Sequence, residues 1–165
     1  MACQWSIHKC FNDFKSQGLS VSRQSLHDYL GHIEDAYLAF PVALFSESLR
    51  KTQTNPKKWY VVDTGLALAI SIGMNQNVGR LFENLIYLDL RRRGHEIYYY
   101  LTEERYEVDF LTRDPEGELH LYQVAWEVDD PETYAREERA LKAAEKELKI
   151  TGTLITPLRY LRNDW

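Results

Sequence analysis

Two strand-like runs joined by a short turn are the feature that most constrains the fold of this chain. Residues 106–112 (YEVDFLT) and 119–126 (LHLYQVAW) carry the aromatic and β-branched side chains that suit a pleated sheet. The Asp-Pro-Glu-Gly sequence between them is typical of a hairpin turn. We predict a three-residue loop, 115–117, with Gly117 in the left-handed conformation. The sequence therefore predicts an antiparallel β-hairpin.

The loop length fixes the register of this hairpin. A three-residue loop places Asp114 opposite Glu118, and the same register sets Asp109 opposite Gln123 with both side chains on one face. A loop one residue longer would instead place Asp109 opposite Tyr122. An acid beside an amide in the middle of a sheet is unusual enough to suggest a site.

Side chains alternate between the two faces of a strand. Along the first strand this alternation puts Glu107, Asp109 and Leu111 on one face. Along the second strand it puts Leu121 and Gln123 on one face, together with Leu119 and Ala125.

Length and composition indicate one or two small globular domains. No apolar run in the 165 residues reaches the about 18 needed to span a bilayer, and the N-terminus lacks the layout of a signal peptide. Cys3 and Cys10 have no second Cys or His cluster near them, so we expect free thiols rather than a disulfide or a zinc site. These features predict a cytoplasmic protein without membrane contact.

Charge is distributed unevenly along the chain. Residues 79–165 contain 13 Lys and Arg against 19 Asp and Glu, so this half is acidic. An acidic surface opposes tight, non-specific binding to phosphate groups. Nucleic-acid binding would require local basic patches or metal ions that offset the acids.

The first 78 residues have the pattern of a partial winged helix. Apolar spacing predicts a helix over residues 5–15, and Ser22 caps a second helix. Strands are expected near 42–45 and 59–62, and the sequence DTG (63–65) closes the second strand. The second helix carries an apolar stripe, which consists of Leu26, Leu30, Ile33 and Tyr37. Two helices followed by a β-ribbon resemble a winged helix that lacks its first helix, so we expect a truncated N-terminus.

Six polar or basic residues in this segment are candidates for nucleic-acid contact. Arg23 and Gln24 lie at the start of the second helix, where a recognition helix would meet base edges. The other four are expected in the loop of the ribbon: Arg50, Lys51, Lys57 and Lys58. The alternative interpretations are a packing helix with a solvated outer face and a loop whose charges only increase solubility.

Residues 79–165 predict a helix, three strands, a helix and a final strand. A helix over 79–93 ends at Gly94, with Arg91, Arg92 and Arg93 in its last turn. Asp130 caps the second helix, which runs to about residue 149, and a strand over 153–156 ends the regular structure. The return of this strand after a helix predicts a crossover and a mixed sheet covered by helices.

Two acidic residues lie on the apolar stripes of these helices. Glu83 is on or beside the stripe of the first helix, so it either has a cation, metal or hydrogen-bonding partner or reaches water at an edge. Glu137 lies on the inward face of the second helix beside Arg136, and an ion pair is the default explanation.

Six segments, taken together and in order, resemble one protein family. They are HIEDAYLAF (32–40), NPKKWYVVDTGL (55–66), GRLFENLIYLDLRRRG (79–94), EVDFL (107–111), QVAW (123–126) and REERAL (136–141). The chain is similar to the C-terminal domain of prokaryotic P-loop ATPases of the AAA type. This resemblance implies an α+β, or α/β, fold in two parts. Residues 1–78 would form the partial winged-helix-like segment, and residues 79–165 a restriction-endonuclease-like α-β-β-β-α-β core with the PD-(D/E)xK signature.

The resemblance also implies a site. Glu83 matches the helix glutamate of that fold, Asp109 the strand aspartate, and Gln123 the acid of the (D/E)xK element. In an active nuclease such carboxylates hold Mg²⁺, and a lysine helps to activate the attacking water. Ala125 stands at the lysine position in this chain, and Trp126 after it carries no ammonium. Two other cations, Lys142 and Arg105, are candidates to reach the site from elsewhere.

These departures favour an accessory module over an enzyme. We expect a nuclease-like fold without cleavage, part of an AAA-type ATP-binding protein, that docks a partner or contacts DNA weakly. The alternative is a Mg²⁺-dependent nuclease acting on DNA or RNA, and a third possibility is a sequence-specific DNA-binding regulator. The sequence contains no G-x-x-x-x-G-K-[ST] run, so the ATPase domain would be a separate part of the protein. A homodimer through the first helix is a further possibility.

Overall fold

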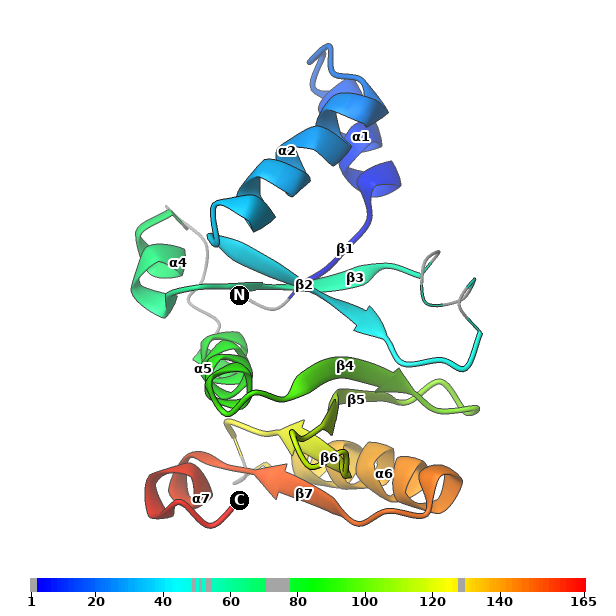
Figure 1. The fold of residues 1–165 in the computed structure, drawn as a ribbon, viewed down its shortest axis with the longest axis vertical. Helices are drawn as coiled ribbons and strands as arrows, with labels where there is room; N and C mark the ends of the chain where they lie inside the picture. The colour runs from blue at the N-terminus through cyan, green and yellow to red at the C-terminus, as the bar shows by residue number, and fades with distance from the viewer. Residues whose placement is uncertain (1–2, 49, 51, 53–54, 71–77, 128–129) are drawn as a thin grey trace.

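One mixed sheet of seven strands runs through the molecule (Figure 1). The computed structural model describes residues 3–48, 50, 52, 55–70, 78–127 and 130–165. Within that part the strand order is β1-β3-β2-β4-β5-β6-β7. The strands are β1 (Cys3–Trp5), β2 (Ala39–Leu44), β3 (Lys57–Val61), β4 (Glu96–Leu101), β5 (Glu107–Arg113), β6 (Leu119–Val124) and β7 (Gly152–Ile155). The predicted mixed sheet flanked by helices is confirmed.

In the part of the chain that the structure describes, helices flank or extend this sheet. They are α1 (Ile7–Ser16), α2 (Arg23–Asp35), α4 (Thr64–Ile70), α5 (Val78–Arg92), α6 (Pro131–Leu148) and α7 (Pro157–Arg162). Figure 1 shows the α1–α2 hairpin at one end of the long axis and β7 with α7 at the other. Among the described residues no helix is both long and apolar enough to cross a membrane.

The N-terminal segment forms its two expected helices, with one correction at its start. The side chains of Ser6 and Ser22 cap α1 and α2 by accepting hydrogen bonds from the backbone N–H groups of Lys9 and Ser25. The first helix was expected to include Trp5, but Trp5 belongs to β1 and is paired with Lys57 of β3. The backbone of Trp5 is extended because it pairs with the edge of β3.

The apolar stripe predicted on α2 is buried at one position only. Leu26 is 4% exposed, whereas Ile33 and Tyr37 are 36% and 66% exposed. The apolar spacing correctly predicted a helix. It did not predict how much of the stripe is buried, because the hairpin projects from the sheet.

Residues 1–78 and 79–165, the two predicted parts of the chain, contribute to one sheet and to one shared hydrophobic cluster. β2 pairs with β4 in parallel, through Ala43↔Tyr98 and Leu44↔Tyr99. The core cluster beneath α5 combines residues from both segments, including Tyr60 and Phe110. The boundary at residue 78 therefore separates segments of the chain but not separate hydrophobic cores.

The β5–β6 hairpin has the predicted turn and register. Gly117 has φ of 93°, and the backbone N–H of Asp114 donates to the carbonyl of Glu118 at 3.0 Å. Pairing runs from Arg113↔Leu119 to Phe110↔Tyr122, and one further step sets Asp109 opposite Gln123. The turn chemistry alone was enough to determine this register.

A bulge in β5 overturns part of the predicted alternation. Tyr98 of β4 pairs with Leu111 and Tyr100 pairs with Val108, so β5 carries one extra residue in this stretch. As a result Val108 and Leu111 both pack in the cluster beneath α6, while Phe110 packs in the cluster beneath α5. Leu111 was expected on the face of Asp109, and this prediction was wrong because the bulge shifts the alternation.

The C-terminal part contains the expected crossover and one further helix. The side chain of Asp130 caps α6, Pro131 occupies its first turn, and β7 returns parallel to β6. Regular structure was expected to end before Pro157, but Thr156 caps the short helix α7. The helix α4, which directly follows β3, was also not predicted. Proline suits the first turn of a helix, and six or seven residues give too little periodicity to reveal one.

Candidate functional site

A cavity of about 520 Å³ opens where the ends of β5 and β6 meet α5 and α6. Its lining includes Glu83 from α5, Asp109 from β5 and Gln123 from β6, the three site residues predicted from the sequence. The lining is completed by Val78, Gly79, Arg80, Val124, Ala125, Trp126, Glu127, Thr133, Arg136 and Glu137. The fold therefore brings the three residues together at one place.

The carboxylate of Asp109 is held by both of its oxygens. Oδ2 accepts a hydrogen bond from the backbone N–H of Val124 at 3.1 Å, across the hairpin. Oδ1 accepts from the ammonium of Lys58 at 3.0 Å. Because one contact is to the main chain of the neighbouring strand, the orientation of Asp109 is set by the sheet itself.

Both the oxygen and the nitrogen of the Gln123 amide have partners within the protein. Oε1 accepts a hydrogen bond from the backbone N–H of Asp109 at 3.1 Å, and Nε2 donates to Oε2 of Glu137 at 2.6 Å. The other oxygen of Glu137 pairs with Arg136 at 2.6 Å, which confirms the predicted ion pair. Gln123 is 3% exposed. It therefore acts as a buried bridge between β5 and α6.

Lys58 supplies a lysine that sequence reasoning did not assign to this site. It was expected in a loop as a candidate for phosphate contact, but it lies in β3 and is 4% exposed. Its Nζ is 3.1 Å from Glu83, 3.0 Å from Asp109 and 2.8 Å from Glu107. A buried ammonium inside three carboxylates has no access to nucleic acid, so this prediction was wrong.

Burial and charge act in opposite directions on this cluster. Burial lowers the pKa of Lys58, but Asp109, Tyr60 and the two glutamates raise it well above its usual value. Burial together with the negative charge of Asp109 raises the pKa of Glu83 to about 7, although Lys58 opposes this change. The Tyr60 hydroxyl donates to Oε1 of Glu83 at 2.7 Å, and burial raises the pKa of Tyr60 well above its usual value. Lys58 is thus a permanent cation in an acidic site.

A small side chain occupies the position where the resemblance places a lysine. Ala125 is 3% exposed, and Trp126 beside it packs edge-on against Phe82 at 5.6 Å between ring centroids. The two other candidates do not line the cavity: Lys142 pairs with Glu138 along α6, and Arg105 lies in the β4–β5 turn with φ of 66°.

The remaining nucleic-acid candidates are spread over the N-terminal segment. Arg23 contacts Nδ1 of His8 at 3.2 Å and lies over the ring of Phe11, and Gln24 donates to Asp28 at 2.9 Å. Their side chains are thus engaged within the helical hairpin. Lys57 and Arg50 are exposed, and Lys51 lies outside the described residues.

The three arginines that end α5 serve the fold. Arg91 lies 3.8 Å over the ring of Phe40, and Arg93 lies 4.1 Å over the ring of Trp165. Gly94 follows with φ of 83°, which confirms the predicted helix end. These cation–π contacts hold the end of α5 against neighbouring aromatic rings.

The residues present do not fit the Mg²⁺ that the fold resemblance implies. Mg²⁺ requires oxygen ligands at about 2.1 Å in near-octahedral geometry. The oxygen of Gln123 is occupied by a backbone N–H, and the ammonium of Lys58 contacts the oxygens of Glu83 and Asp109 on which a metal would depend. The site as folded is an ion-pair cluster.

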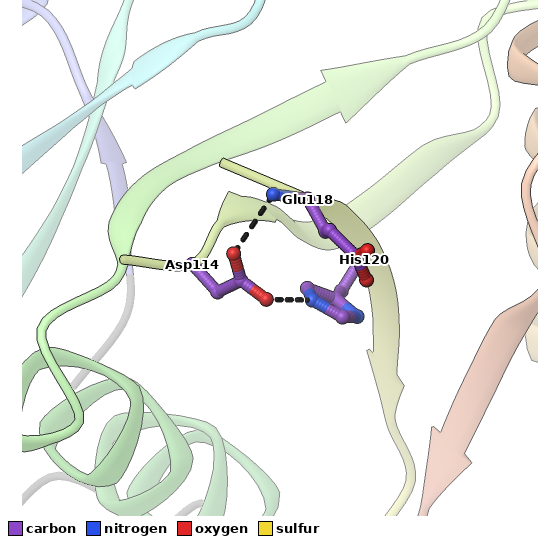
Figure 2. A group of neighbouring side chains, drawn as sticks. All are labelled: Asp114, Glu118 and His120. Atoms are coloured by element: carbon purple, nitrogen blue, oxygen red, sulfur yellow. Dashed lines mark hydrogen bonds and ion pairs between the residues drawn. The ribbon is translucent and has the colours of Figure 1, made fainter. Parts of the chain in front are cut away.

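A second acidic cluster lies at the turn end of the hairpin (Figure 2). Ligand-type atoms of Asp114, Glu118 and His120 lie within 4.8 Å of one another, a donor set of the kind that transition metals bind. Both Asp114 oxygens already have partners, the backbone N–H of Glu118 at 2.8 Å and Nε2 of His120 at 2.8 Å. The hydrogen bond from His120 lowers the pKa of Asp114. This cluster stabilises the turn.

The cysteines are consistent with a reduced protein where they are described. Cys10 is a free thiol in α1, and burial raises its pKa. The side chain of Cys3 lies outside the described part of the structure.

Comparisons with known proteins divide the chain near residue 78. Residues 11–77 match the model of a domain of unknown function (DUF8612), and residues 78–158 match another (DUF4143), which is found in proteins associated with AAA-type ATPases. Neither description states an activity.

Two curated relatives match most of the chain. An uncharacterised protein of Methanocaldococcus jannaschii is 38% identical over 148 residues, which cover 87% of this chain and 31% of that protein. An uncharacterised protein of Haemophilus influenzae is 25% identical over 146 residues, which cover 87% and 36% of the two chains. The chain thus spans about a third of the length of the curated relatives it matches. No solved structure matches it significantly.

Proposed function

We propose that this chain is a non-cleaving accessory module of an AAA-type ATP-binding protein, with a nuclease-like site that serves the fold. The observation that carries the proposal is the amide of Gln123, whose oxygen accepts from the backbone N–H of Asp109 and whose nitrogen donates to Glu137. Together with the ammonium of Lys58, which pairs with Glu83 and Asp109, these contacts fill the site with partners from the protein itself. The resemblance to ATPase-associated domains supports the context.

The rim of the cavity supports a weak contact with single-stranded nucleic acid. Trp126 is 43% exposed, and Arg80 and Arg136 line the same cavity. An exposed indole offers a stacking surface for a base, and guanidinium groups attract phosphate. The excess of acids in residues 79–165 keeps such binding weak and strongly dependent on salt.

The alternative function is a Mg²⁺-dependent nuclease. One observation favours it, since a lysine does reach both Glu83 and Asp109, although it comes from β3 rather than from β6. For this alternative, Lys58 would have to move away from Glu83 and Asp109 before nucleic acid is cleaved.

One assay separates the two functions. The wild-type protein is incubated with plasmid and with single-stranded DNA and RNA in Mg²⁺ or Mn²⁺, beside Asp109→Ala prepared in the same way. We expect no cleavage above the level of the variant. Cleavage by the wild type that disappears with Asp109→Ala would establish the nuclease and overturn the proposal.

A binding measurement tests the contact at the rim. We expect fluorescence anisotropy of a labelled single strand to show weak binding at low salt that is lost in Trp126→Ala. The control is Tyr29→Ala, an exposed aromatic residue of α2 that does not line the cavity. Binding that is insensitive to Trp126→Ala would place the contact elsewhere.

A further inference from the structure

We infer that Lys58 is the resident cation of the Glu83–Asp109 site and that it excludes a divalent metal from this site. The inference rests on the proposed non-cleaving function and gives it a physical cause. It also assigns a role to β3, a strand of the N-terminal segment, inside the site of the C-terminal segment.

The geometry of Lys58 matches that of a bound ion. An ammonium group has three N–H donors, and Nζ has three carboxylate oxygens within 2.8–3.1 Å, from Glu83, Glu107 and Asp109. These acceptors come from two elements, α5 and β5, that face each other across the site. Lys58 thus joins the same two carboxylates that a metal would join.

A metal and the ammonium cannot share this position. A divalent ion bound at about 2.1 Å by the oxygens of Glu83 and Asp109 that Lys58 contacts would lie close to Nζ, and two cations repel strongly in a buried site. For the metal to enter, the ammonium would have to leave. The backbone of β3 opposes this, because the strand is paired on both sides, with β1 and with β2.

The substitutions on β6 agree with a cation of lower charge. Gln123 is neutral where the resemblance places an acid, and Ala125 is neutral where it places a lysine. A site that holds a monovalent ammonium requires one negative charge fewer than a site that holds Mg²⁺. The neutral Gln123 removes one negative charge, and Lys58 supplies from β3 the positive charge that Ala125 lacks.

Charged groups around Lys58 keep it in place. Nζ lies 2.8 Å from Glu107 and 3.0 Å from Asp109, and the side chain is 5% exposed. The ring of Tyr99 lies 5.9 Å from Nζ and adds an aromatic face on the same side.

The test is Mn²⁺ binding, measured by electron paramagnetic resonance of free Mn²⁺ and by calorimetry, with no activity readout. Four proteins are compared: wild type, Lys58→Met, the double variant Lys58→Met with Asp109→Asn, and Lys57→Met as an exposed control on the same strand. We expect Lys58→Met to bind one Mn²⁺ with a Kd at or below about 1 mM, at least about tenfold tighter than wild type. Asp109→Asn should remove this gain, and Lys57→Met should behave as wild type.

Folding is monitored separately because loss of Lys58 leaves carboxylates unpaired. We expect Mn²⁺ to raise the Tm of Lys58→Met, or to allow it to refold, and to leave the Tm of the wild type unchanged. A Lys58→Met protein that neither binds Mn²⁺ nor gains stability from it would overturn the inference.

The wild type alone provides an independent check. Sub-millimolar Mn²⁺ binding by the wild type that is lost with Asp109→Asn would show that Lys58 does not exclude the metal. Failure of the inference is distinguishable from failure of the proposed function, since the latter requires cleavage of nucleic acid, which metal binding alone does not produce.

Discussion

The two ends of the β5–β6 hairpin hold similar charged groups in different settings. At the turn, Asp114 and His120 are six residues apart and pair where both side chains still meet solvent. At the other end, Lys58 reaches Asp109 across 51 residues of sequence, and its side chain is 5% exposed. The first pair belongs to one hairpin, whereas the second joins two segments of the chain.

This difference determines how much each pair contributes. An exposed pair gains little because water already solvates both charges. A buried cluster contributes little net energy compared with apolar packing, but removal of one member leaves the others without a partner, and that is costly. The comparison therefore predicts unequal responses to the loss of one residue at each end.

Removal of Lys58 should have the largest effect. We expect Lys58→Met, in the absence of divalent metal, to lower the free energy of unfolding by about 3 kcal/mol, because up to three carboxylates lose their shared cation. Urea unfolding followed by circular dichroism measures this change. The control is Lys57→Met, whose side chain is exposed on the same strand and which should shift the free energy by less than about 0.5 kcal/mol. Equal effects of the two substitutions would contradict the buried ion cluster.

The second-largest effect should be a pH dependence of stability that Glu83 causes. Its carboxyl has a pKa of about 7 in the folded protein and an ordinary value of 4.5, so the native state binds more protons than the unfolded chain between these values. The corresponding stabilisation is complete below about pH 4.5 and is lost as pH rises to 7, on the order of 2 kcal/mol.

Glu83→Gln isolates this contribution. The groups that face Glu83 are Lys58 and Tyr60 from β3 and Asp109 from β5, and all three remain in the variant. Urea titrations from pH 4.5 to 7.5 should therefore show a shallower fall in the free energy of unfolding for Glu83→Gln. Parallel profiles of the wild type and Glu83→Gln over this range would show that Glu83 is ionised throughout.

The turn should give the smallest effect. We expect His120→Ala to lower the Tm by no more than about 2 °C, because Asp114 keeps its hydrogen bond from the backbone of Glu118. Differential scanning fluorimetry is sufficient to measure it. A loss comparable to that of Lys58→Met would show that the turn cluster is as important as the buried one.

The sequence was most informative where structure is local. Hairpin register follows from Asp114 and Gly117, and helix ends follow from Ser22, Asp130 and Gly94, because caps and turns depend on a few neighbouring residues. The meeting of Glu83, Asp109 and Gln123 could be anticipated from the register together with a family resemblance.

Lys58 was missed because its role depends on tertiary structure. Next to Lys57 it has the appearance of loop charge, and nothing local indicates which of the two is buried. One signal was present, since Lys58 and Tyr60 share a face of a strand and Tyr60 is an evident core residue. The bulge in β5 was equally hidden, because it depends on the partner strand β4 rather than on the residues of β5.

The short parallel pairing between β2 and β4 has a mechanical consequence. Two pairs of residues, Ala43↔Tyr98 and Leu44↔Tyr99, make the sheet one continuous plate. Force applied to the α1–α2 hairpin passes through β2 and β3 to Lys58 and from there to the cavity. Separation of β2 from β4 would also move Lys58 away from Glu83 and Asp109. The electrostatic potential in the cavity therefore depends on whether the sheet stays intact.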